Sequence, residues 1–176
     1  MNIILIGFKN CGKTTIGKYL AARLQYTFLD TDRVLENYYS KKTTINLSVR
    51  EIYTKEGGTL FRELEKNALI TLTEIHNTII ATGGGVVLDS DNVAVLKKLG
   101  TNVYLRATKE LLLSRAQYSE IPAFLDKNNA SESFDQMYNL RKDIYESIAD
   151  YVVEVDKRNV DDIADQILSN VGWVKR

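Results

Sequence analysis

The sequence predicts a three-layer α/β/α fold, in which helices cover both faces of a five-stranded parallel sheet. Two observations carry this prediction. Five short apolar runs, each too short to be a helix, are separated by segments with helical spacing, and these runs span residues 3–6, 27–29, 78–81, 103–105 and 151–155. Strands that alternate with helices form right-handed βαβ units, which bring the carboxyl ends of the strands to one edge of the sheet. We therefore expect the functional residues along that edge.

The helical segments follow the strands in order. Apolar residues recur at helical spacing in three long segments, residues 14–24, 61–72 and 134–148. Ser48 and Glu51 stand at the spacing of a capping box, so they predict the start of a short helix. Gly57 and Gly58 follow at the distance where that helix should end.

The chain shows no division into parts. No repeat, linker or low-complexity stretch interrupts the 176 residues, so we expect one domain over residues 1–176. Residues 117–130 have weak periodicity, many polar side chains and the only proline, Pro122. A polar excursion from the edge of a sheet is typical of a segment that covers a binding site, and we interpret it as a lid.

Composition excludes several classes of protein. Lys and Arg together number 23, as do Asp and Glu, so no overall basic field would hold nucleic acid or an anionic membrane. The first apolar run is too short for a signal peptide or a membrane span, so we expect a cytoplasmic protein. Because Cys11 is the only cysteine and His76 the only histidine, an internal disulfide is excluded, and any metal must bind hard oxygen ligands.

A phosphate-binding loop follows the first strand. The run Gly7-Phe8-Lys9-Asn10-Cys11-Gly12-Lys13-Thr14 matches G-x-x-x-x-G-K-[ST], between a strand and a helix as the motif requires. Glycine allows the backbone N–H groups to approach phosphates, Lys13 supplies a cation, and the Thr14 hydroxyl can reach Mg²⁺. The loop predicts that ATP binds at Asn10, Cys11, Gly12, Lys13, Thr14 and Thr15. Cys11 could be a reactive thiol beside Lys13, although a small residue that merely fills the loop is the commoner explanation.

Two carboxylates follow the second strand, in Asp30-Thr31-Asp32. One could hold Mg²⁺ through water while the other accepts the proton of an attacking hydroxyl, as phosphoryl transfer requires. Asp32 could instead cap a helix that runs through Tyr38, and the spacing alone leaves both interpretations open.

Further candidates lie on the next segments. Three glycines, Gly83 to Gly85, follow the third strand and would let a ligand or another backbone approach closely, although a tight turn is an alternative. Arg62 and Arg141 each stand in a partly apolar helical segment. Most such arginines are solvated, but two that converge would bind a carboxylate by charge-assisted hydrogen bonds.

Taken in order, these features resemble the shikimate kinase family. The resemblance extends almost from end to end and includes the phosphate loop, Asp30-Thr31-Asp32, Phe61-Arg62 with Glu65, Gly83-Gly84-Gly85, Arg115, and Arg141 with Tyr145. It implies one kinase domain over residues 1–176, of the nucleoside-monophosphate-kinase type, with a lid at about residues 117–130. The implied reaction is ATP-dependent phosphorylation of shikimate at its 3-hydroxyl, in the biosynthesis of chorismate and the aromatic amino acids.

The resemblance also implies roles for individual residues. Lys13 and Asp32 would be catalytic, Thr14 and Asp30 would place Mg²⁺, Glu65 would orient Arg62, and Arg115 and Arg158 would lie at the adenine. Shikimate would bind to Asp32, Arg62, Gly83, Gly84, Gly85 and Arg141. The partners implied are shikimate and ATP alone, with neither nucleic acid nor membrane, and we expect a monomer.

Three positions depart from the family pattern. Asn10 replaces a glycine, residues 38–47 are longer than usual, and Ile121 stands before the lid proline in place of an arginine. Either another cation, from Lys9, Arg115 or Lys127, then reaches the transferred phosphate, or the protein is a slow enzyme. Two alternatives stay open: a kinase for another small polyhydroxy acid such as gluconate, and an ATP-binding regulatory module with weak transfer activity.

Overall fold

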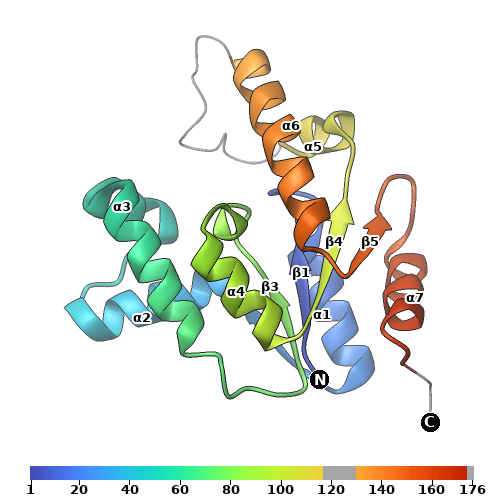
Figure 1. Ribbon diagram of the computed structural model, residues 1–176, viewed down its shortest axis with the longest axis horizontal. Coiled ribbons are helices and arrows are strands. Elements are labelled where there is room, and N and C mark those ends of the chain that lie inside the picture. Colours follow the sequence, from blue (N-terminus) through green and yellow to red (C-terminus); the bar gives the residue numbers. More distant parts are fainter. Residues whose placement is uncertain (117–129, 174–176) are drawn as a thin grey trace.

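A computed structural model describes residues 1–116 and 130–173, with side chains from residue 134 onward in the second range. Its sheet is parallel throughout and has the strand order β2-β3-β1-β4-β5, as Figure 1 shows. The strands are β1 (Ile3–Ile6), β2 (Thr27–Asp30), β3 (Thr78–Ala81), β4 (Thr101–Arg106) and β5 (Tyr151–Glu154). The predicted five-stranded parallel sheet is confirmed. The strand predicted at residues 103–105 is longer at both ends, because β4 pairs with β1 on one side and β5 on the other.

Helices form the outer layers. The helices are α1 (Lys13–Leu24), α2 (Thr31–Thr43), α3 (Val49–Ile70), α4 (Ser90–Leu99), α5 (Lys109–Ala116), α6 (Ala130–Ile148) and α7 (Val160–Asn170), with a 3-10 turn η1 (Val86–Leu88). In Figure 1, α4 lies in front of the sheet and α1 behind it, while α2 and α3 extend beyond β2. The predicted three layers are therefore confirmed. The lid expected at residues 117–130 falls almost entirely outside the described residues.

The central strand decides where a ligand can bind. All four residues of β1 are fully buried, because helices cover both faces of a parallel sheet. In the sheet, β1 is followed by β3 and then β2 on one side, and by β4 and then β5 on the other. The chain therefore forms β2 and β3 on one side of β1 before it crosses to form β4 and β5 on the other. A crevice forms outside the carboxyl ends of the strands where the strand order reverses. The phosphate loop, which follows β1, lies at this position.

The α2–α3 unit has a small core of its own. Six buried residues form it, namely Leu35, Tyr39, Ile52, Phe61, Leu64 and Ala68. Ser48 and Glu51 make both hydrogen bonds of the predicted capping box at the start of α3. Gly57 interrupts α3 with φ 76° and ψ 168°, so the predicted end of a short helix corresponds to a kink between two helical parts.

Asn2 ties together the edge of the sheet opposite the phosphate loop. Its side-chain amide donates to the carbonyl oxygens of Ile75 and Leu99 at 2.8 and 2.9 Å, and its oxygen accepts from the Thr78 N–H at 3.1 Å. Asn2 is buried, so these three bonds satisfy the donors and the acceptor of its side-chain amide, which water does not reach.

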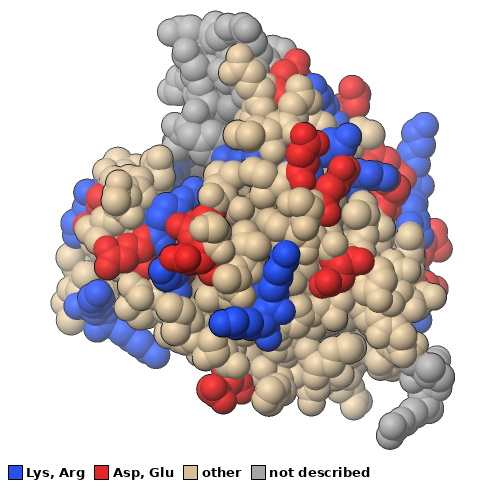
Figure 2. All heavy atoms as spheres, in the orientation of Figure 1, with Lys and Arg blue, Asp and Glu red and all other residues tan. Residues whose placement is uncertain are grey.

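Basic and acidic side chains lie next to one another over the face drawn in Figure 2. Among the helices of residues 1–116 and 130–173, none is long and apolar enough to span a membrane.

Candidate active site

The phosphate loop is shaped by three residues with left-handed backbone angles. Gly7, Asn10 and Gly12 have φ of 143°, 71° and 110°. Asn10 therefore adopts the conformation that the family pattern assigns to glycine, which asparagine reaches more readily than most residues. Any side chain at Gly7 would also meet the Leu105 carbonyl oxygen, which lies 2.9 Å from the position of a Cβ.

Lys13 points back into this loop. Its ammonium group donates to the carbonyl oxygens of Gly7 and Phe8 at 2.8 and 2.7 Å, and the residue is buried. A phosphate in the loop would give the same cation a stronger, charged partner. Cys11 is almost wholly buried, and its Sγ lies 3.8 Å from the Lys13 Nζ. This burial favours the structural interpretation of Cys11 over a reactive thiol.

Asp30 links the phosphate loop to the second strand. The Thr14 hydroxyl donates to its Oδ2 at 3.2 Å, and its Oδ1 accepts from the Asp32 N–H at 3.0 Å. Asp30 is thus the N-cap of α2, and the alternative in which Asp32 caps this helix is wrong. Because α2 begins at Thr31 and continues to Thr43, much of the long segment at residues 38–47 extends the helix instead of forming a loop.

The oxygens of Thr14 and Asp30 suit Mg²⁺, which prefers hard oxygen ligands and retains several waters. No group of three or more His, Cys, Asp or Glu within the described part of the chain could hold a metal ion by itself. Mg²⁺ at this place would therefore take its other ligands from phosphate oxygens and water.

The Asp32 carboxyl is adjacent to this pair. Burial raises its pKa above the ordinary value, and the neighbouring charge of Asp30 raises it further, while Lys13 and Lys9 act in the opposite direction. A carboxylate whose pKa is raised is a better proton acceptor than an exposed one.

The three glycines after β3 form a wall that several predicted residues approach. A Cβ on Gly83 would lie 2.6 Å from the Asp32 Oδ1, and one on Gly85 would lie 2.9 Å from an Arg62 nitrogen. Between them, a Cβ on Gly84 would lie 3.3 Å from the Lys9 backbone nitrogen. Consecutive Cα atoms are about 3.8 Å apart, so Gly83 and Gly85 are less than about 8 Å apart, and Asp32, the phosphate loop and Arg62 all approach this short segment.

Arg62 is held by a buried carboxylate. Its Nη1 donates to the Glu65 Oε2 at 2.6 Å, as the resemblance implied, and the Asn92 side chain donates to the same oxygen at 3.2 Å. Burial raises the pKa of Glu65, and the Arg62 charge and hydrogen bond act against this rise.

Arg141 reaches the wall from α6. Its Nη1 lies 3.5 Å from the Gly84 carbonyl oxygen. Burial lowers the pKa of Arg141, and the positive charge of Arg62 lowers it further. Two partly desolvated guanidinium groups that repel each other in this way create a local preference for an anion such as a carboxylate.

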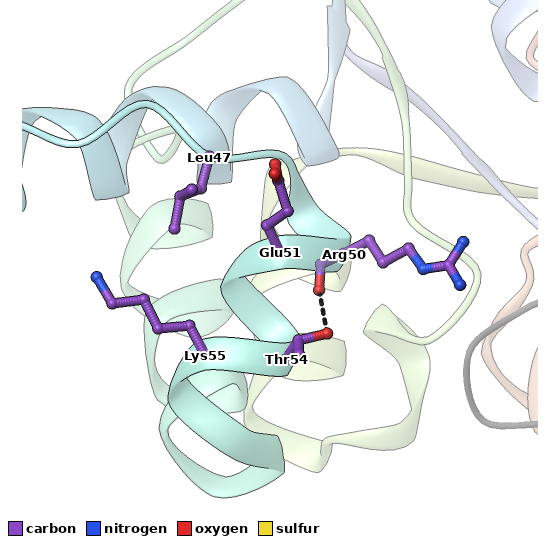
Figure 3. A pocket seen from close by; sticks show the side chains of 5 residues that line it. All are labelled: Leu47, Arg50, Glu51, Thr54 and Lys55. Atoms are coloured by element: carbon purple, nitrogen blue, oxygen red, sulfur yellow. Dashed lines mark hydrogen bonds between the residues drawn. The ribbon is translucent and has the colours of Figure 1, made fainter.

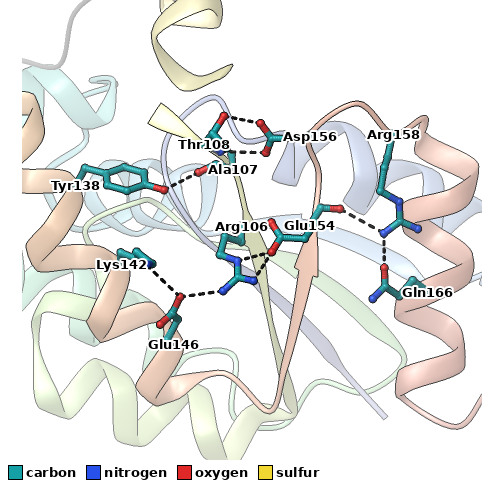
Figure 4. A network of polar contacts seen from close by, with 10 residues as sticks. All are labelled: Arg106, Ala107, Thr108, Tyr138, Lys142, Glu146, Glu154, Asp156, Arg158 and Gln166. Carbon is teal, nitrogen blue, oxygen red and sulfur yellow. Dashed lines mark hydrogen bonds and ion pairs between the residues drawn. The ribbon is translucent and has the colours of Figure 1, made fainter. Parts of the chain in front are cut away.

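The two arginines predicted to lie at the adenine follow β4 and β5, on the side of β1 opposite to the glycine wall. Arg115 donates from Nη1 to the Asn10 carbonyl oxygen at 3.0 Å, so it contacts the phosphate loop. Arg158 contacts Gln166 and donates to the carbonyl oxygen of Glu154, as Figure 4 shows. It also donates to the carbonyl oxygen of Asp162. Its contacts here join β5 to α7, and the adenine role of both arginines stays a prediction.

Thr108 and Asp156 join the loops after β4 and β5 (Figure 4). The Asp156 carboxylate accepts from the backbone N–H and the hydroxyl of Thr108. Ile121 and Lys127 lie outside the described residues, whereas Lys9 is exposed in the phosphate loop.

Sequence reasoning assigned no role to three contacting groups. The Thr31 hydroxyl accepts from the Gly83 N–H at 2.9 Å, Asn92 supports Glu65, and the Tyr145 hydroxyl donates to the Gly84 carbonyl oxygen at 2.5 Å. Each contact joins residues far apart in the chain, so no local pattern signals it.

A separate hollow of about 370 Å³ lies at the start of α3 (Figure 3). Its lining consists of Leu47, Arg50, Glu51, Thr54 and Lys55. None of these residues belongs to the sheet edge, and the phosphate loop does not contribute to it. We therefore place the candidate active site at the glycine wall and the phosphate loop.

The family model described as shikimate kinase matches residues 9–172. The chain belongs to the shikimate kinase family. A shikimate kinase of Caldanaerobacter subterraneus is 34% identical and covers 95% of this chain and 94% of its own. The structure of a shikimate kinase from Acinetobacter baumannii in complex with shikimate has a TM-score of 0.85 and 32% identity, covering 97% of this chain and 92% of its own.

Membership of the shikimate kinase family makes the protein an ATP-using phosphotransferase, in agreement with the phosphate loop. A gluconokinase from Sinorhizobium meliloti is also similar, with a TM-score of 0.53 and 15% identity, covering 97% of this chain and 91% of its own. That likeness shows the fold alone.

Proposed function

We propose that the protein transfers the γ-phosphate of ATP to the 3-hydroxyl of shikimate, giving shikimate 3-phosphate and ADP. One observation carries the proposal: the glycine wall brings Asp32, the phosphate loop and two arginines, Arg62 and Arg141, to one place. A relative that is 32% identical has been solved with shikimate bound. Shikimate offers a carboxylate and hydroxyls on one small ring, which suits a basic pair at one end and a carboxylate at the other.

The acceptor would be held at both ends. Arg62 and Arg141 would bind its carboxylate, while Asp32 would accept a hydrogen bond from the attacking hydroxyl and take its proton as the bond to phosphorus forms. The glycines leave room for the ring, because a Cβ on Gly83 or Gly85 would occupy space next to Asp32 or Arg62. Phosphoryl transfer depends mainly on such positioning, since little covalent chemistry is asked of the protein.

ATP would bind with its phosphates over the loop of Gly7 to Thr14. Lys13 would leave the carbonyl oxygens of Gly7 and Phe8 for the β- and γ-phosphates. Thr14 and Asp30 would hold Mg²⁺, which, when bound, neutralises charge on the phosphates. Arg115 and Arg158 would lie at the base.

The test is ADP release from Mg-ATP with shikimate, quinate and gluconate as separate acceptors. We expect release with shikimate and, because the gluconokinase likeness extends only to the fold, little with gluconate. Absence of stimulation by shikimate in protein that binds ATP would refute the proposal and favour the regulatory alternative. In the same assay, Asp32→Asn should abolish transfer and leave ATP binding nearly unchanged.

A further inference from the structure

Tyr145 lies where the glycine wall (Gly83 to Gly85), the phosphate loop and α6 meet. It is fully buried, and its hydroxyl donates to the Gly84 carbonyl oxygen at 2.5 Å. Arg141, one helical turn earlier on α6, has its Nη1 3.5 Å from the same oxygen. The Gly84 carbonyl oxygen therefore accepts hydrogen bonds from both the tyrosine hydroxyl and a guanidinium that is predicted to bind substrate.

The ring of Tyr145 is packed on two sides. It meets Phe8 of the phosphate loop edge to face, with centroids 5.0 Å apart, and stacks on Tyr104 of β4 at 5.0 Å. Aromatic contacts of this geometry restrict the ring well, because they add to the burial of a large apolar surface. The position of the hydroxyl is thus set by the phosphate loop and the sheet together.

The hydroxyl remains a donor over the whole working range of pH. Burial raises the pKa of Tyr145 well above its ordinary value, and the Arg141 charge only partly opposes this. A phenol donates one hydrogen bond, which the Gly84 carbonyl oxygen accepts, so the lone pairs of the tyrosine oxygen can still accept from the adjacent guanidinium.

The wall itself lies directly against the phosphate loop. A Cβ on Gly84 would lie 3.3 Å from the Lys9 nitrogen and 3.6 Å from the Gly7 carbonyl oxygen. A small shift of Gly84 would therefore change the distance between acceptor and phosphate. Such shifts matter, because misplacement by 1 Å can lower a rate by about a hundredfold.

We propose that Tyr145 is a positioning residue, which keeps Gly84 and Arg141 in fixed relation to the phosphate loop so that the acceptor hydroxyl faces the γ-phosphate. This inference rests on the proposed function, and it adds a specific requirement: the tyrosine hydroxyl serves the acceptor side of the reaction and not the binding of ATP.

Tyr138 provides a matched control on the same helix. Its ring stacks on the same Phe8 with centroids 4.8 Å apart, and its hydroxyl donates to the Ala107 carbonyl oxygen at 3.0 Å. Tyr138→Phe and Tyr145→Phe each remove one hydroxyl and leave the ring in place. They differ in whether the lost bond reached the glycine wall.

The experiment measures kcat and KM for shikimate and for ATP in the wild type and both variants. We expect Tyr145→Phe to lower kcat, because the acceptor shifts relative to the γ-phosphate, and to raise the KM for shikimate about five- to twentyfold, as loss of one buried hydrogen bond predicts. The KM for ATP should change less than twofold. Tyr138→Phe should leave the KM for shikimate within twofold of the wild-type value. Equal changes in both KM values of Tyr145→Phe, or an equal rise in the KM for shikimate in Tyr138→Phe, would overturn the proposal.

A double-mutant cycle tests the link to Arg141 independently. In an Arg141→Lys background, Tyr145→Phe should raise the KM for shikimate by a clearly smaller factor than in the wild type, because the two side chains act on one carbonyl. Fully multiplicative effects would contradict the coupling. Wild-type protein that shows no activity with shikimate would refute the proposed function, whereas an active wild type with an unaltered Tyr145→Phe refutes this inference alone.

Discussion

Replacing Gly83 with alanine should slow phosphoryl transfer without weakening the fold. The added Cβ would lie 2.6 Å from the Asp32 Oδ1, whereas ordinary contacts begin at 3.4 Å. The carboxylate must therefore move by about 0.8 Å, the difference between these two distances. Asp32 can do so by rotating its side chain, because the crowded atom is the end of a side chain and not backbone.

The size of the effect follows from this displacement. A shift of about 1 Å in a catalytic group can lower a rate by about a hundredfold, so we expect kcat to fall by about 10²-fold. Gly83 does not have left-handed backbone angles, and alanine should fit the backbone. Restricting the unfolded chain then offsets part of any crowding, and we expect the free energy of unfolding to stay within about 1 kcal/mol of the wild-type value.

Gly58→Ala is the matched control. Gly58 also lacks left-handed angles, and its Cβ would meet only the Tyr53 side chain, at 3.6 Å or more. Steady-state kinetics and denaturant unfolding of both variants give the comparison. An unchanged kcat in folded Gly83→Ala would refute the assigned position and role of Asp32, and an equal loss of kcat in Gly58→Ala would refute the geometric explanation.

Three further predictions concern binding, pH and stability. Gly85→Ala, whose Cβ would lie 2.9 Å from an Arg62 nitrogen, should raise the KM for shikimate about tenfold with a smaller effect on kcat, and an unchanged KM would contradict it. Asp32→Asn should raise the free energy of unfolding by about 0.5–2 kcal/mol at pH 8. The raised pKa of Asp32 disfavours its ionised form in the folded protein, so this gain should disappear as pH falls through the folded pKa toward about 4, and a gain that persists in acid would refute the reasoning. Asn2→Ala should lower the free energy of unfolding by about 3 kcal/mol, because three partners, two of them in buried hydrogen bonds, are left without Asn2, while both KM values stay unchanged; chemical denaturation checks this.

Local sequence patterns were sufficient to predict the strands and the phosphate loop. Five apolar runs predicted the five strands, since short buried strands leave a signal in consecutive residues. Asn10, which replaces a glycine of the family pattern, adopts a left-handed angle that asparagine tolerates better than most residues. Alternation of strands and helices then predicted the edge at which Asp30, Asp32 and the three glycines meet.

The cap of α2 was a choice that the sequence left open. Both Asp30 and Asp32 are good capping residues, and either position of the helix start agrees with the spacing. Pairing of β2 with β3 extends through Asp30, so the strand ends there and the helix begins at Thr31. This two-residue difference in the capping position leaves the Asp32 carboxylate available beside Gly83.

By itself, then, the sequence determined the fold class, the loop that binds phosphate and the residue types expected around it, because each depends on neighbours in the chain. Only the tertiary structure decided which of these groups touch. Arg141 and Tyr145 meet Gly84 although 57 and 61 residues separate them, and Asn92 reaches Glu65 across 27 residues. Contacts of this kind arise from the packing of α3, α4 and α6 beside the sheet, and packing depends on the whole chain at once.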